Sequence, residues 1–499
     1  MVITMDNFNI FPRPSSVEER NGTFIFNETD TIYLICGKND AADEFERIAP
    51  ELWRGFTTGK SHLEIVKRDG VCGAAVISAD RDALPSEKAT EYEYELVCGC
   101  GGIYINYKET IGLIHAFSTI LQLIGPYSRR GKNFAVPCCE IKDSPLLKLR
   151  GVHICVFPET SLRFVKKVVR LCGLLKVSHV ILEFWGTYRY KFMKELSWEN
   201  AFTAEDIKPI ISDGRGMGIE FIPMFNHLGH ASQSRFKAGK NVLLDNAPEY
   251  EEFFEPGGWT WNVKNPEVLE LQTEVRRELA ELCGDGKYFH VGCDEVYFAD
   301  GNDNGLDPRQ NKEFVDYLNM LAREVKSLGR QPIMWGDMFL DSTVFKYPPY
   351  CNNVSHRCHD FENNLRQLDA DMIIDDWQYN VDKSMDETVK FFAGRRSTDK
   401  LILSPWEGMG AVSAEANIGG RCELAAEYGM LGVIATTWDT LRANNRNLVY
   451  AACRMWSQDL KYTDMRTWEA YKCIAMQYIR KLLPSGGDFE ASGWCEHEI

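Results

Sequence analysis

The sequence predicts an α/β protein in which a small α+β domain precedes a (β/α)8 barrel. The chain has 499 residues, more than a single ordinary domain needs. From residue 147 onward, eight short apolar runs alternate with helical patterns. Polar or aromatic residues follow nearly every run, as they do at the catalytic end of a barrel. A doubly wound parallel sheet is the structural alternative, and the count of eight runs favours the barrel.

Residues 1–125 are predicted to form the first domain. The first of its two helical patterns places Phe45 and Leu52 on one apolar face. The second, residues 111–124, contains His115 and Gln122 and is too short to cross a membrane, so it predicts a buried helix. A basic, glycine-containing connector is expected over residues 126–146. Turn residues separate the β-like runs, which are Thr23–Phe26, Thr31–Ile35, His62–Val66, Tyr92–Leu96 and Ile103–Tyr107.

Residues 147–460 are predicted to form the barrel. Helical stripes lie between most of its strands, and Thr203 and Asp206 form a capping-box pattern before one of these helices. Residues 461–499 are expected to form a helical tail that packs against the barrel. The predicted strands are 148–156, 178–184, 219–225, 287–293, 331–335, 371–376, 400–404 and 431–437.

Composition narrows the class of function. A net charge of −16 disfavours binding to nucleic acid or to an anionic membrane. The segment Met1–Asp6 lacks the basic and apolar regions of a signal peptide, and the 16 cysteines are scattered, which together indicate reduced thiols and a cytoplasmic protein. No cofactor and no metal are expected. His356, Cys358 and His359 could ligate an ion, but no second cluster has matching spacing. The residues do not set the oligomeric state, for which a homodimer is the expectation.

The ends of the predicted strands carry acids, amides and tryptophans. Because the carboxyl ends of parallel strands meet at one face of a barrel, these residues predict an aromatic-walled cup with acids at its base. Such a cup suits a sugar, whose apolar faces stack on rings and whose hydroxyls pair with carboxylates and amides. Each tryptophan could instead be a core residue. The segments are Arg150–His153 on the first strand, Glu183–Trp185, Asn226–His230, Asp294–Glu295, Trp335–Asp337, Asp376–Tyr379, Trp406–Glu407 and Trp438–Asp439.

Asp294 and Glu295 end the fourth apolar run, and the rest of the site is predicted around them. Because side chains alternate along a strand, the two acids can share a target only if the chain has left the regular strand. Gly292 and Cys293 are small and could let a ligand approach the backbone closely. The alternative interpretation is a strand end with two solvated acids before a loop.

The segment Phe289–Val296 resembles the His-x-Gly-Gly-Asp-Glu signature of glycoside hydrolase family 20, the β-N-acetylhexosaminidases. Phe221–Pro223 followed by Gly229–Ala231 is similar to the family's third-strand segment, and Arg150–Gly151 to the opening of its first strand. The first domain resembles the non-catalytic domain that often precedes the barrel. The Gly-Cys-Asp-Glu-Val-Tyr run and the Trp335–Met338 segment are more similar to the intracellular hexosaminidase D-like branch.

The sequence departs from the classical members of that family at several positions. Asn226 stands where they carry Asp, Leu228 where they carry Pro, and Thr440 where they carry Glu. Trp406–Glu407 stands where they carry Tyr-x-Asp, and Cys293 where most carry Gly. These departures leave the acid pair intact. They fall on contacts to the 4- and 6-hydroxyls of the sugar, so the preference between N-acetylglucosamine and N-acetylgalactosamine stays open.

The resemblance implies an exo-acting enzyme that releases a terminal N-acetylhexosamine by a retaining, substrate-assisted mechanism. The 2-acetamido oxygen attacks C1, Glu295 protonates the leaving oxygen and then deprotonates water, and Asp294 accepts the acetamido N–H. Tyr379 is the candidate donor to the acetamido oxygen. Glu295 needs a partly apolar wall to hold its proton, whereas Asp294 needs donors to stay charged.

The other candidate residues are predicted to bind the sugar or to orient the acids. His230 is expected to orient one acid, with His290 as a second candidate, and either could instead be a core histidine. Arg150 is expected to pair with ring hydroxyls; its alternative is a salt bridge at the barrel mouth. Asp337 could contact a hydroxyl or be a solvated loop acid. The full set predicted to bind substrate is Arg150, His230, Trp335, Asp337, Trp377, Tyr379, Trp406 and Trp438.

Two other functions compete with this prediction. A catalytically silent sugar-binding barrel is disfavoured by the intact Asp294–Glu295 pair, which a binding protein does not need. A metal-assisted hydrolase would need a second His or Asp cluster at ligand spacing among the strand ends, where tryptophans stand instead. Activity in excess chelator would separate this last class from the first.

Overall fold

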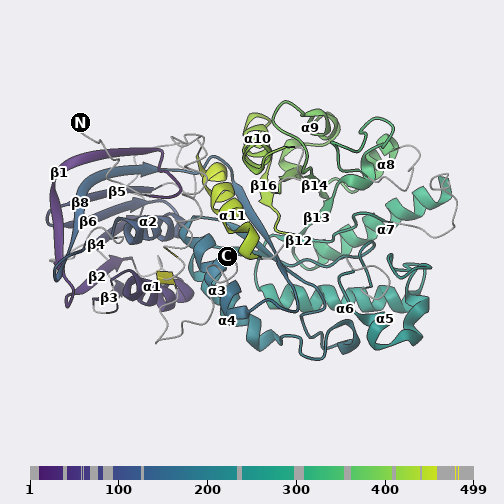
Figure 1. Ribbon diagram of the computed structural model, residues 1–499, viewed down its shortest axis with the longest axis horizontal. Coiled ribbons are helices and arrows are strands. Elements are labelled where there is room, and N and C mark those ends of the chain that lie inside the picture. Colours follow the sequence, from purple (N-terminus) through teal and green to yellow (C-terminus); the bar gives the residue numbers. More distant parts are fainter. Residues whose placement is uncertain are drawn as a thin grey trace.

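The computed structural model describes residues 10–37, 42–57, 59, 61–67, 77–81, 94–124, 129–232, 239–296, 308–352, 361–406, 412–438, 441–457, 478 and 481–482. Over these residues an N-terminal α+β domain lies beside a larger unit built on eight parallel strands (Figure 1). The predicted fold class is therefore confirmed.

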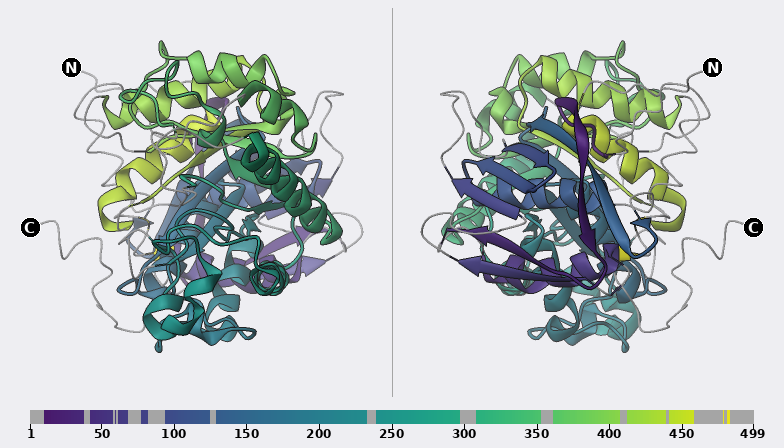
Figure 2. Two further views of the ribbon diagram at one scale, coloured as in Figure 1. Left: turned by 90° about the vertical axis from the view of Figure 1, so that its right-hand side faces the viewer. Right: turned by 90° about the vertical axis from the view of Figure 1, so that its left-hand side faces the viewer.

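The first domain contains one mixed sheet with the strand order β1-β8-β5-β6-β4-β2-β3, and β7 pairs with β8. Strands β2, β3, β4 and β6 pair in parallel, whereas β5 is antiparallel to both β6 and β8, and β1 is antiparallel to β8. Figure 2 (right) shows this sheet nearest the viewer. Its strands are β1 (Ser16–Asn27), β2 (Thr31–Cys36), β3 (His62–Lys67), β4 (Ile77–Arg81), β5 (Tyr94–Gly99), β6 (Gly102–Tyr107), β7 (Arg129–Arg130) and β8 (Asn133–Asp143).

Two helices, α1 (Asp43–Phe56) and α2 (Thr110–Leu123), cover the face of the sheet that is turned toward the barrel (Figure 1). Phe45 and Leu52 of α1 are buried, as the apolar face predicts. Helix α2 is buried almost all round, since it lies between the sheet and the barrel helix α3 (Leu162–Leu174). Residues 111–124 are therefore the predicted buried helix. No helix in the described part of the chain is long and apolar enough to cross a membrane.

The prediction of a connector over residues 126–146 is wrong. Strand β8 occupies most of this range and lies between β1 and β5 in the sheet. The alternation of buried and exposed side chains along β8 is interrupted after Pro137, because the adjacent Cys138 and Cys139 are both buried. This interruption hides the strand in the sequence. The first domain thus extends to Asp143, and the chain enters the first barrel strand a few residues later.

The eight barrel strands lie where the sequence predicts them. Each pairs in parallel with its neighbours, in the order β11-β10-β9-β16-β15-β14-β13-β12. All their residues are buried or partly buried, as expected for strands that line a closed interior and are covered by helices. The strands are β9 (Leu149–Val156), β10 (His179–Phe184), β11 (Glu220–Ile222), β12 (Tyr288–His290), β13 (Gln331–Trp335), β14 (Ile373–Trp377), β15 (Leu401–Ser404) and β16 (Gly432–Ala435).

Helices follow the strands and surround the barrel. Thr203 caps α4 through the predicted capping box with Asp206. Asn265 caps α6, and Pro266 occupies its first turn, where a missing N–H costs nothing. Besides α3, these helices are α4 (Ala204–Gly216), α5 (Leu243–Asn246), α6 (Pro266–Cys283), α7 (Pro308–Ser327), α8 (Phe361–Gln367), α9 (Glu387–Ala393), α10 (Ala414–Glu427) and α11 (Leu441–Trp456).

The barrel closes between its two shortest strands, β11 and β12. One bridge pair, Met224 with His290, joins them beyond the end of β11. The His290 N–H donates to the Pro223 carbonyl over 2.9 Å, and the Phe225 N–H donates to the His290 carbonyl over 3.2 Å. Farther along, the His227 N–H donates to the Val291 carbonyl over 3.2 Å. This closure leads directly into the segments that carry His230 and Asp294.

A buried charge network lies at the amino end of the barrel, where it meets the first domain. Asp143, the last residue of β8, accepts Lys176 Nζ at 2.5 Å, the Tyr94 hydroxyl at 2.9 Å and the Trp456 indole N–H at 2.8 Å. The Arg150 guanidinium lies over the Trp456 ring, 4.9 Å from its centroid. These contacts join the sheet, the base of the barrel and the end of α11.

The predicted C-terminal tail lies largely outside the described residues. The structure places Tyr478, Lys481 and Leu482 of that range. Tyr478 is buried, with its ring 6.0 Å from that of Phe56, and the Leu482 carbonyl accepts Arg170 Nη1 at 2.5 Å.

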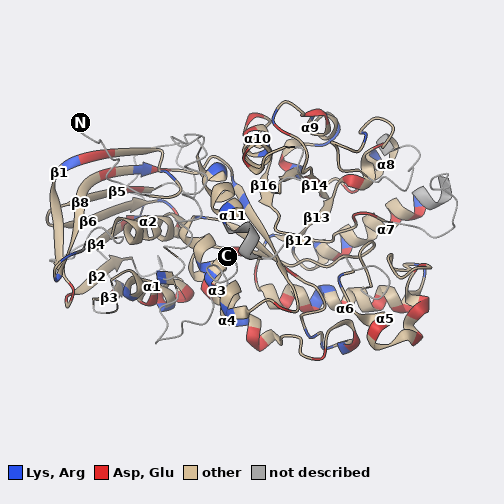
Figure 3. Ribbon diagram, in the orientation of Figure 1, with Lys and Arg blue, Asp and Glu red and all other residues tan. Residues whose placement is uncertain are grey.

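Acidic residues gather along α5 and the short 3-10 helix Pro248–Phe253 (Figure 3), which disfavours polyanionic partners there.

Candidate active site

The segment that carries Asp294 and Glu295 leaves the regular strand directly after β12. Two adjacent acids can face one target only if the chain does this. Gly292, Cys293 and Glu295 all have left-handed backbone conformations, with φ of 68°, 70° and 43°. Left-handed φ is unfavourable for side chains with a Cβ, so contacts from neighbouring segments must hold this path. Asp294 and Glu295 are thereby turned toward the same neighbour, His230.

Close packing explains the small residues around the acids. A Cβ on Gly292 would lie 2.2 Å from Asn226 Oδ1, and a Cβ on Gly229 would lie 2.2 Å from the Asp294 carbonyl oxygen. Cys293 is fully buried. The prediction that Gly292 and Cys293 admit a ligand to the backbone is therefore wrong, because protein atoms fill that space.

His230 lies between the two acids. Its Nε2 is 3.2 Å from Asp294 Oδ2 and 3.2 Å from Glu295 Oε2. Burial favours the neutral ring, but the charge of Asp294 and the hydrogen bonds to both acids outweigh it and raise the pKa of His230 to about 10. The predicted orienting role of His230 thus has a geometric basis, and His230 is an imidazolium at neutral pH.

The two acids differ in environment. Burial acts to raise the pKa of Asp294, but the charge and hydrogen bond of His230 outweigh burial and hold this pKa below its usual value. Asp294 Oδ1 is buried and has no hydrogen-bond partner among the residues that the structure describes. The Glu295 side chain is 36% exposed, against 10% for Asp294. One charged carboxylate thus has an unused acceptor beside a second carboxyl that solvent can reach.

Asp337, just after β13, is a third acid at this site. It is buried, and its Oδ2 accepts the backbone N–H of Glu295 at 2.9 Å. Its Oδ1 accepts the Trp377 indole N–H at 3.2 Å. Burial, together with the nearby charges of Asp294 and Glu295, raises the pKa of Asp337 to about 8. Asp337 is therefore neither a solvated acid nor directed at open solvent.

The predicted aromatic wall assembles at the end of β14 and in the segments that follow β14, β15 and β16. The Trp377 and Tyr379 rings lie 5.2 Å apart, and the Tyr379 and Trp406 rings lie 5.4 Å apart. The Trp438 indole N–H donates to the Tyr379 hydroxyl over 2.6 Å. The three tryptophans are partly exposed, whereas Tyr379 is buried behind them. The structure thus brings these four predicted residues together at the carboxyl end of the barrel.

Trp335 and His290 lie below this wall, inside the barrel. Trp335 is fully buried, with its ring 4.4 Å from His290 and 6.0 Å from Trp438. His290 accepts the Gly292 N–H at Nδ1 over 3.1 Å. His290 is therefore a core histidine that supports the start of the segment carrying Asp294 and Glu295. This is the alternative that the sequence leaves open for His290. Trp335 forms the floor on which Trp438 packs.

A second polar cluster, at the ends of β9 and β10, borders the site. Glu183 Oε2 accepts His153 Nε2 at 3.2 Å, the Trp185 indole N–H at 3.0 Å and Lys240 Nζ at 3.0 Å. Glu183 Oε1 accepts the Asn226 amide at 2.7 Å. Lys240 Nζ also lies over the rings of Trp185 and Trp438, 3.7 and 4.5 Å from their centroids.

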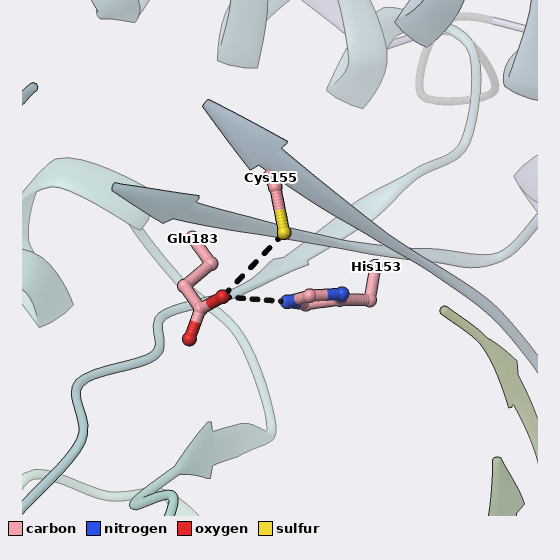
Figure 4. A group of neighbouring side chains, drawn as sticks. All are labelled: His153, Cys155 and Glu183. Carbon is pink, nitrogen blue, oxygen red and sulfur yellow. Dashed lines mark hydrogen bonds and ion pairs between the residues drawn. The ribbon is translucent and has the colours of Figure 1, made fainter. Parts of the chain in front are cut away.

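His153, Cys155 and Glu183 are close enough to be considered as metal ligands, since their ligand atoms lie within 4.8 Å of one another (Figure 4). The Lys240 ammonium already supplies the positive charge beside Glu183. Burial raises the pKa of the Cys155 thiol well above its usual value, so a thiolate is disfavoured. The donor set does not fit a cation, and these residues form a compensated polar core.

Arg150 is not part of the site, and its predicted role in binding ring hydroxyls is wrong. It stands at the start of β9, and the site lies at the other end of that strand, about 20 Å away at about 3.3 Å a residue. Its Nε donates to the Lys176 carbonyl over 2.9 Å, and its Nη1 to the Leu147 carbonyl over 2.8 Å. The guanidinium is thus bound at the base of the barrel, not in a salt bridge at its mouth.

Sequence reasoning missed Trp259 and Lys240. The Trp259 indole N–H donates to the Glu295 carbonyl over 2.7 Å, and its ring lies 4.3 Å from that of His230. Both residues stand in the long segment between β11 and α6, outside its two short helices, α5 and Pro248–Phe253. The Gly-Gly-Trp-Thr-Trp run at 257–261 was the available signal, because two tryptophans in a glycine-containing loop need a surface to cover.

Several predicted positions lie outside the described residues. They include the possible metal ligands His356, Cys358 and His359, together with Glu407 and Thr440. The described residues that directly follow β15 therefore end at Trp406, and those that directly follow β16 end at Trp438.

Comparisons with known proteins agree with this architecture. A family model described as glycosyl hydrolase family 20, catalytic domain, matches residues 177–391, and one described as glycosyl hydrolase family 20, domain 2, matches residues 7–144. The second match covers β8, in agreement with the corrected end of the first domain.

Similar proteins include a lacto-N-biosidase of Bifidobacterium bifidum, 23% identical over 291 residues, which are 55% of this chain and 25% of that protein. A beta-hexosaminidase of Emericella nidulans is 26% identical over 285 residues, 50% of this chain and 46% of that protein. The chain thus matches less than half the length of either. The solved exo beta-N-acetylglucosaminidase of Vibrio harveyi shares the fold, with a TM-score of 0.68 and 15% identity over 95% of this chain and 77% of that one.

Proposed function

Because the chain belongs to glycosyl hydrolase family 20, we propose that it is an exo-acting β-N-acetylhexosaminidase that releases a terminal N-acetylglucosamine or N-acetylgalactosamine. The observation that carries this proposal is the state of Asp294. One of its oxygens is held by His230, and the other is buried without a partner among the described residues. A buried acceptor left open calls for a donor from the substrate, such as an acetamido N–H.

The proposed reaction uses both acids in two steps. In the first, the substrate's acetamido oxygen bonds to C1 while the glycosidic C1–O bond breaks, and Glu295 gives its proton to the leaving oxygen. Asp294 accepts the acetamido N–H and balances the positive charge of the ring that forms. In the second, Glu295 takes a proton from water as the water oxygen bonds to C1 and the acetamido group is restored.

The surrounding residues suit these steps. His230 keeps Asp294 charged, as a partner to a cationic intermediate must be. The partly exposed Trp377, Trp406 and Trp438 offer ring faces to an apolar sugar surface and to the acetamido methyl group. Tyr379, already bonded to Trp438, is proposed to donate to the acetamido oxygen.

The test is hydrolysis of three aryl β-glycosides, carrying N-acetylglucosamine, N-acetylgalactosamine and glucose. We expect cleavage of at least one acetamido sugar and not of glucose, and a loss of about 10²- to 10⁴-fold in kcat in Glu295→Gln. Glu423→Gln is the matched control, since Glu423 lies on α10 and pairs with Lys383 and Arg454 away from the site. Excess chelator should leave the rate unchanged.

Equal cleavage of the glucoside would contradict the substrate-assisted mechanism, because glucose has no acetamido group. Binding of N-acetylglucosamine without cleavage of any glycoside would favour a catalytically silent sugar-binding barrel. The ratio of the two acetamido sugars decides a preference that the residues leave open.

We also propose a hexosaminidase D-like branch, a cytoplasmic location and a homodimer. Cys293 before the acids and the Trp335–Met338 segment support the branch. The described cysteines are free, and all but Cys100 are buried, which suits a reducing compartment. Subcellular fractionation tests the location, and sedimentation of the purified protein tests the dimer.

A further inference from the structure

Glu295 has an unusual backbone position for a residue whose carboxyl must be placed accurately. It lies outside β12, in the left-handed region, at φ 43°. Its peptide groups therefore cannot be fixed by the strand ladder or by a helix. Contacts from elsewhere in the fold must hold them if the carboxyl is to keep one position.

Two side chains make those contacts, one on each side of Glu295. Asp337 Oδ2 accepts the Glu295 N–H at 2.9 Å, and the Trp259 indole N–H donates to the Glu295 carbonyl over 2.7 Å. Asp337 follows β13, whereas Trp259 belongs to the segment between β11 and α6. Both residues are at least nine-tenths buried, so the two bonds are shielded from water.

Each of the two residues is itself fixed by another part of the site. Asp337 Oδ1 accepts the indole N–H of Trp377, a wall residue, at 3.2 Å. The Trp259 ring lies 4.3 Å from His230, whose Nε2 is 3.2 Å from the Glu295 carboxyl. The backbone of Glu295 is thus held by Asp337 and Trp259, while His230, which packs against Trp259, contacts the carboxyls of Glu295 and Asp294.

We propose that Asp337 and Trp259 are positioning residues that hold the peptide of Glu295 from both sides and so place its carboxyl against the glycosidic oxygen. This inference rests on the proposed function and adds to it two residues that act through Glu295. Asp337 then has no sugar hydroxyl to bind, in contrast to the expectation from the sequence. Both oxygens of Asp337 already accept a protein N–H.

The test compares three variants with wild type. Asp337→Ala removes both acceptors, Asp337→Asn keeps one carbonyl oxygen, and Trp259→Phe removes only the indole N–H. We expect kcat on the aryl N-acetylhexosaminide to fall about 100-fold in Asp337→Ala, the effect of a misplaced catalytic group. Asp337→Asn and Trp259→Phe should lie between it and wild type. KM and the Kd of N-acetylglucosamine, measured by calorimetry, should stay within about threefold, because none of the replaced side chains is proposed to contact the sugar.

Two matched controls separate positioning from stability. Asp376→Asn changes an equally buried carboxylate that pairs with Arg421 and Thr388 outside the barrel interior. Trp53→Phe removes an indole N–H that donates to Ser61 in the first domain. Both should leave kcat of the folded enzyme unchanged. If Asp337→Ala does not fold, the two conservative variants still carry the test.

Hydrogen exchange provides a readout that needs no activity. Exchange of the peptide spanning residues 288–296 should be faster in all three variants than in wild type and in both controls. If wild type hydrolyses no glycoside, the proposed function fails, and this exchange measurement still decides the positioning role. A tenfold or larger rise in KM and Kd with kcat retained would show that Asp337 binds sugar. Unchanged kcat and unchanged exchange would also overturn the proposal.

Discussion

The two ends of the barrel both bury charge, but they balance it differently. At the amino end, Lys176 pairs with Asp143, and the Arg150 guanidinium donates to backbone carbonyls. At the carboxyl end, Asp294 and Glu295 share the imidazolium of His230, and the Asp337 carboxyl accepts the Glu295 N–H beside them. Among the described residues, the ammonium that lies near these acids is that of Lys240, which is already paired with Glu183.

This difference separates residues that stabilise the fold from residues that act. Charges that are paired and hydrogen-bonded hold two domains together and have no capacity left for a ligand. Burial and then the charges of Asp294 and Glu295 raise the pKa of Asp337 to about 8. One oxygen of Asp294 is buried without a partner among the described residues. A surplus of buried acids lowers the stability of the fold. A substrate that becomes positively charged during the reaction can compensate this surplus.

The largest expected effect is on the amino end. Lys176→Met leaves Asp143 buried without its cation, which should lower the free energy of unfolding by about 3–5 kcal/mol. Urea unfolding measures this loss, and kcat of the folded fraction should not change. Lys326→Met is the control, because Lys326 is 37% exposed and pairs with Asp369 and Asp371 near the surface, where such pairs contribute about 0–1 kcal/mol. Loss of activity without loss of stability would contradict the division between the two ends.

Replacing Arg150 sharpens the same comparison. Arg150→Lys cannot keep the donors to the Lys176, Leu147 and Lys148 carbonyls, so unfolding should become easier by about 1.5–3 kcal/mol. KM for the aryl glycosides should be unchanged, since the residue lies at the far end of β9. A large rise in KM would restore the role in sugar binding that the sequence predicts.

The expected effect that is smallest over a single pH unit concerns the pH dependence of stability at the carboxyl end of the barrel. Folded Asp337 keeps its proton up to about pH 8, whereas an unfolded aspartate loses it near about pH 4. Between these values the folded state binds more protons, so this group's contribution, complete below about pH 4, is lost as pH rises toward 8. Relative to Asp337→Asn, wild type should lose up to about 1.4 kcal/mol of stability per pH unit.

Urea unfolding at several pH values from 5 to 8 provides this measurement. Asp376→Asn serves as the control, since Asp376 pairs with Arg421. Parallel stability curves for wild type and Asp337→Asn would show that Asp337 is ionised throughout this range.

The sequence predicted the fold well because buried parallel strands are short apolar runs that helices separate. All eight barrel strands lie within or beside their predicted ranges, but β11 and β12 are shorter than predicted, ending at Ile222 and His290. Beyond these points the chain stays apolar while its backbone turns left-handed at Gly292. Hydrophobicity does not report that change of backbone conformation. The hidden alternation in β8 caused the error at the end of the first domain.

The site could be predicted only in part, for a related reason. The position of a residue after a strand indicates which end of the barrel it occupies, and this placed Asp294, Glu295 and the tryptophans correctly. Arg150 shows the limit of that argument, because it stands at the start of its strand. Trp259 and the orientation of Asp337 depend on long-range contacts to Glu295. No local pattern encodes such contacts.

The closure between β11 and β12 has a mechanical consequence for the barrel. A single bridge pair joins these strands, and they lead to His230 and to the two acids respectively. This seam has the shortest run of paired residues among the barrel strands, so it is where we expect the barrel to open first. Opening it would draw the imidazolium away from both carboxyls while the other strands stay paired. Heat inactivation should therefore precede global unfolding, and it should reverse on cooling as the seam closes.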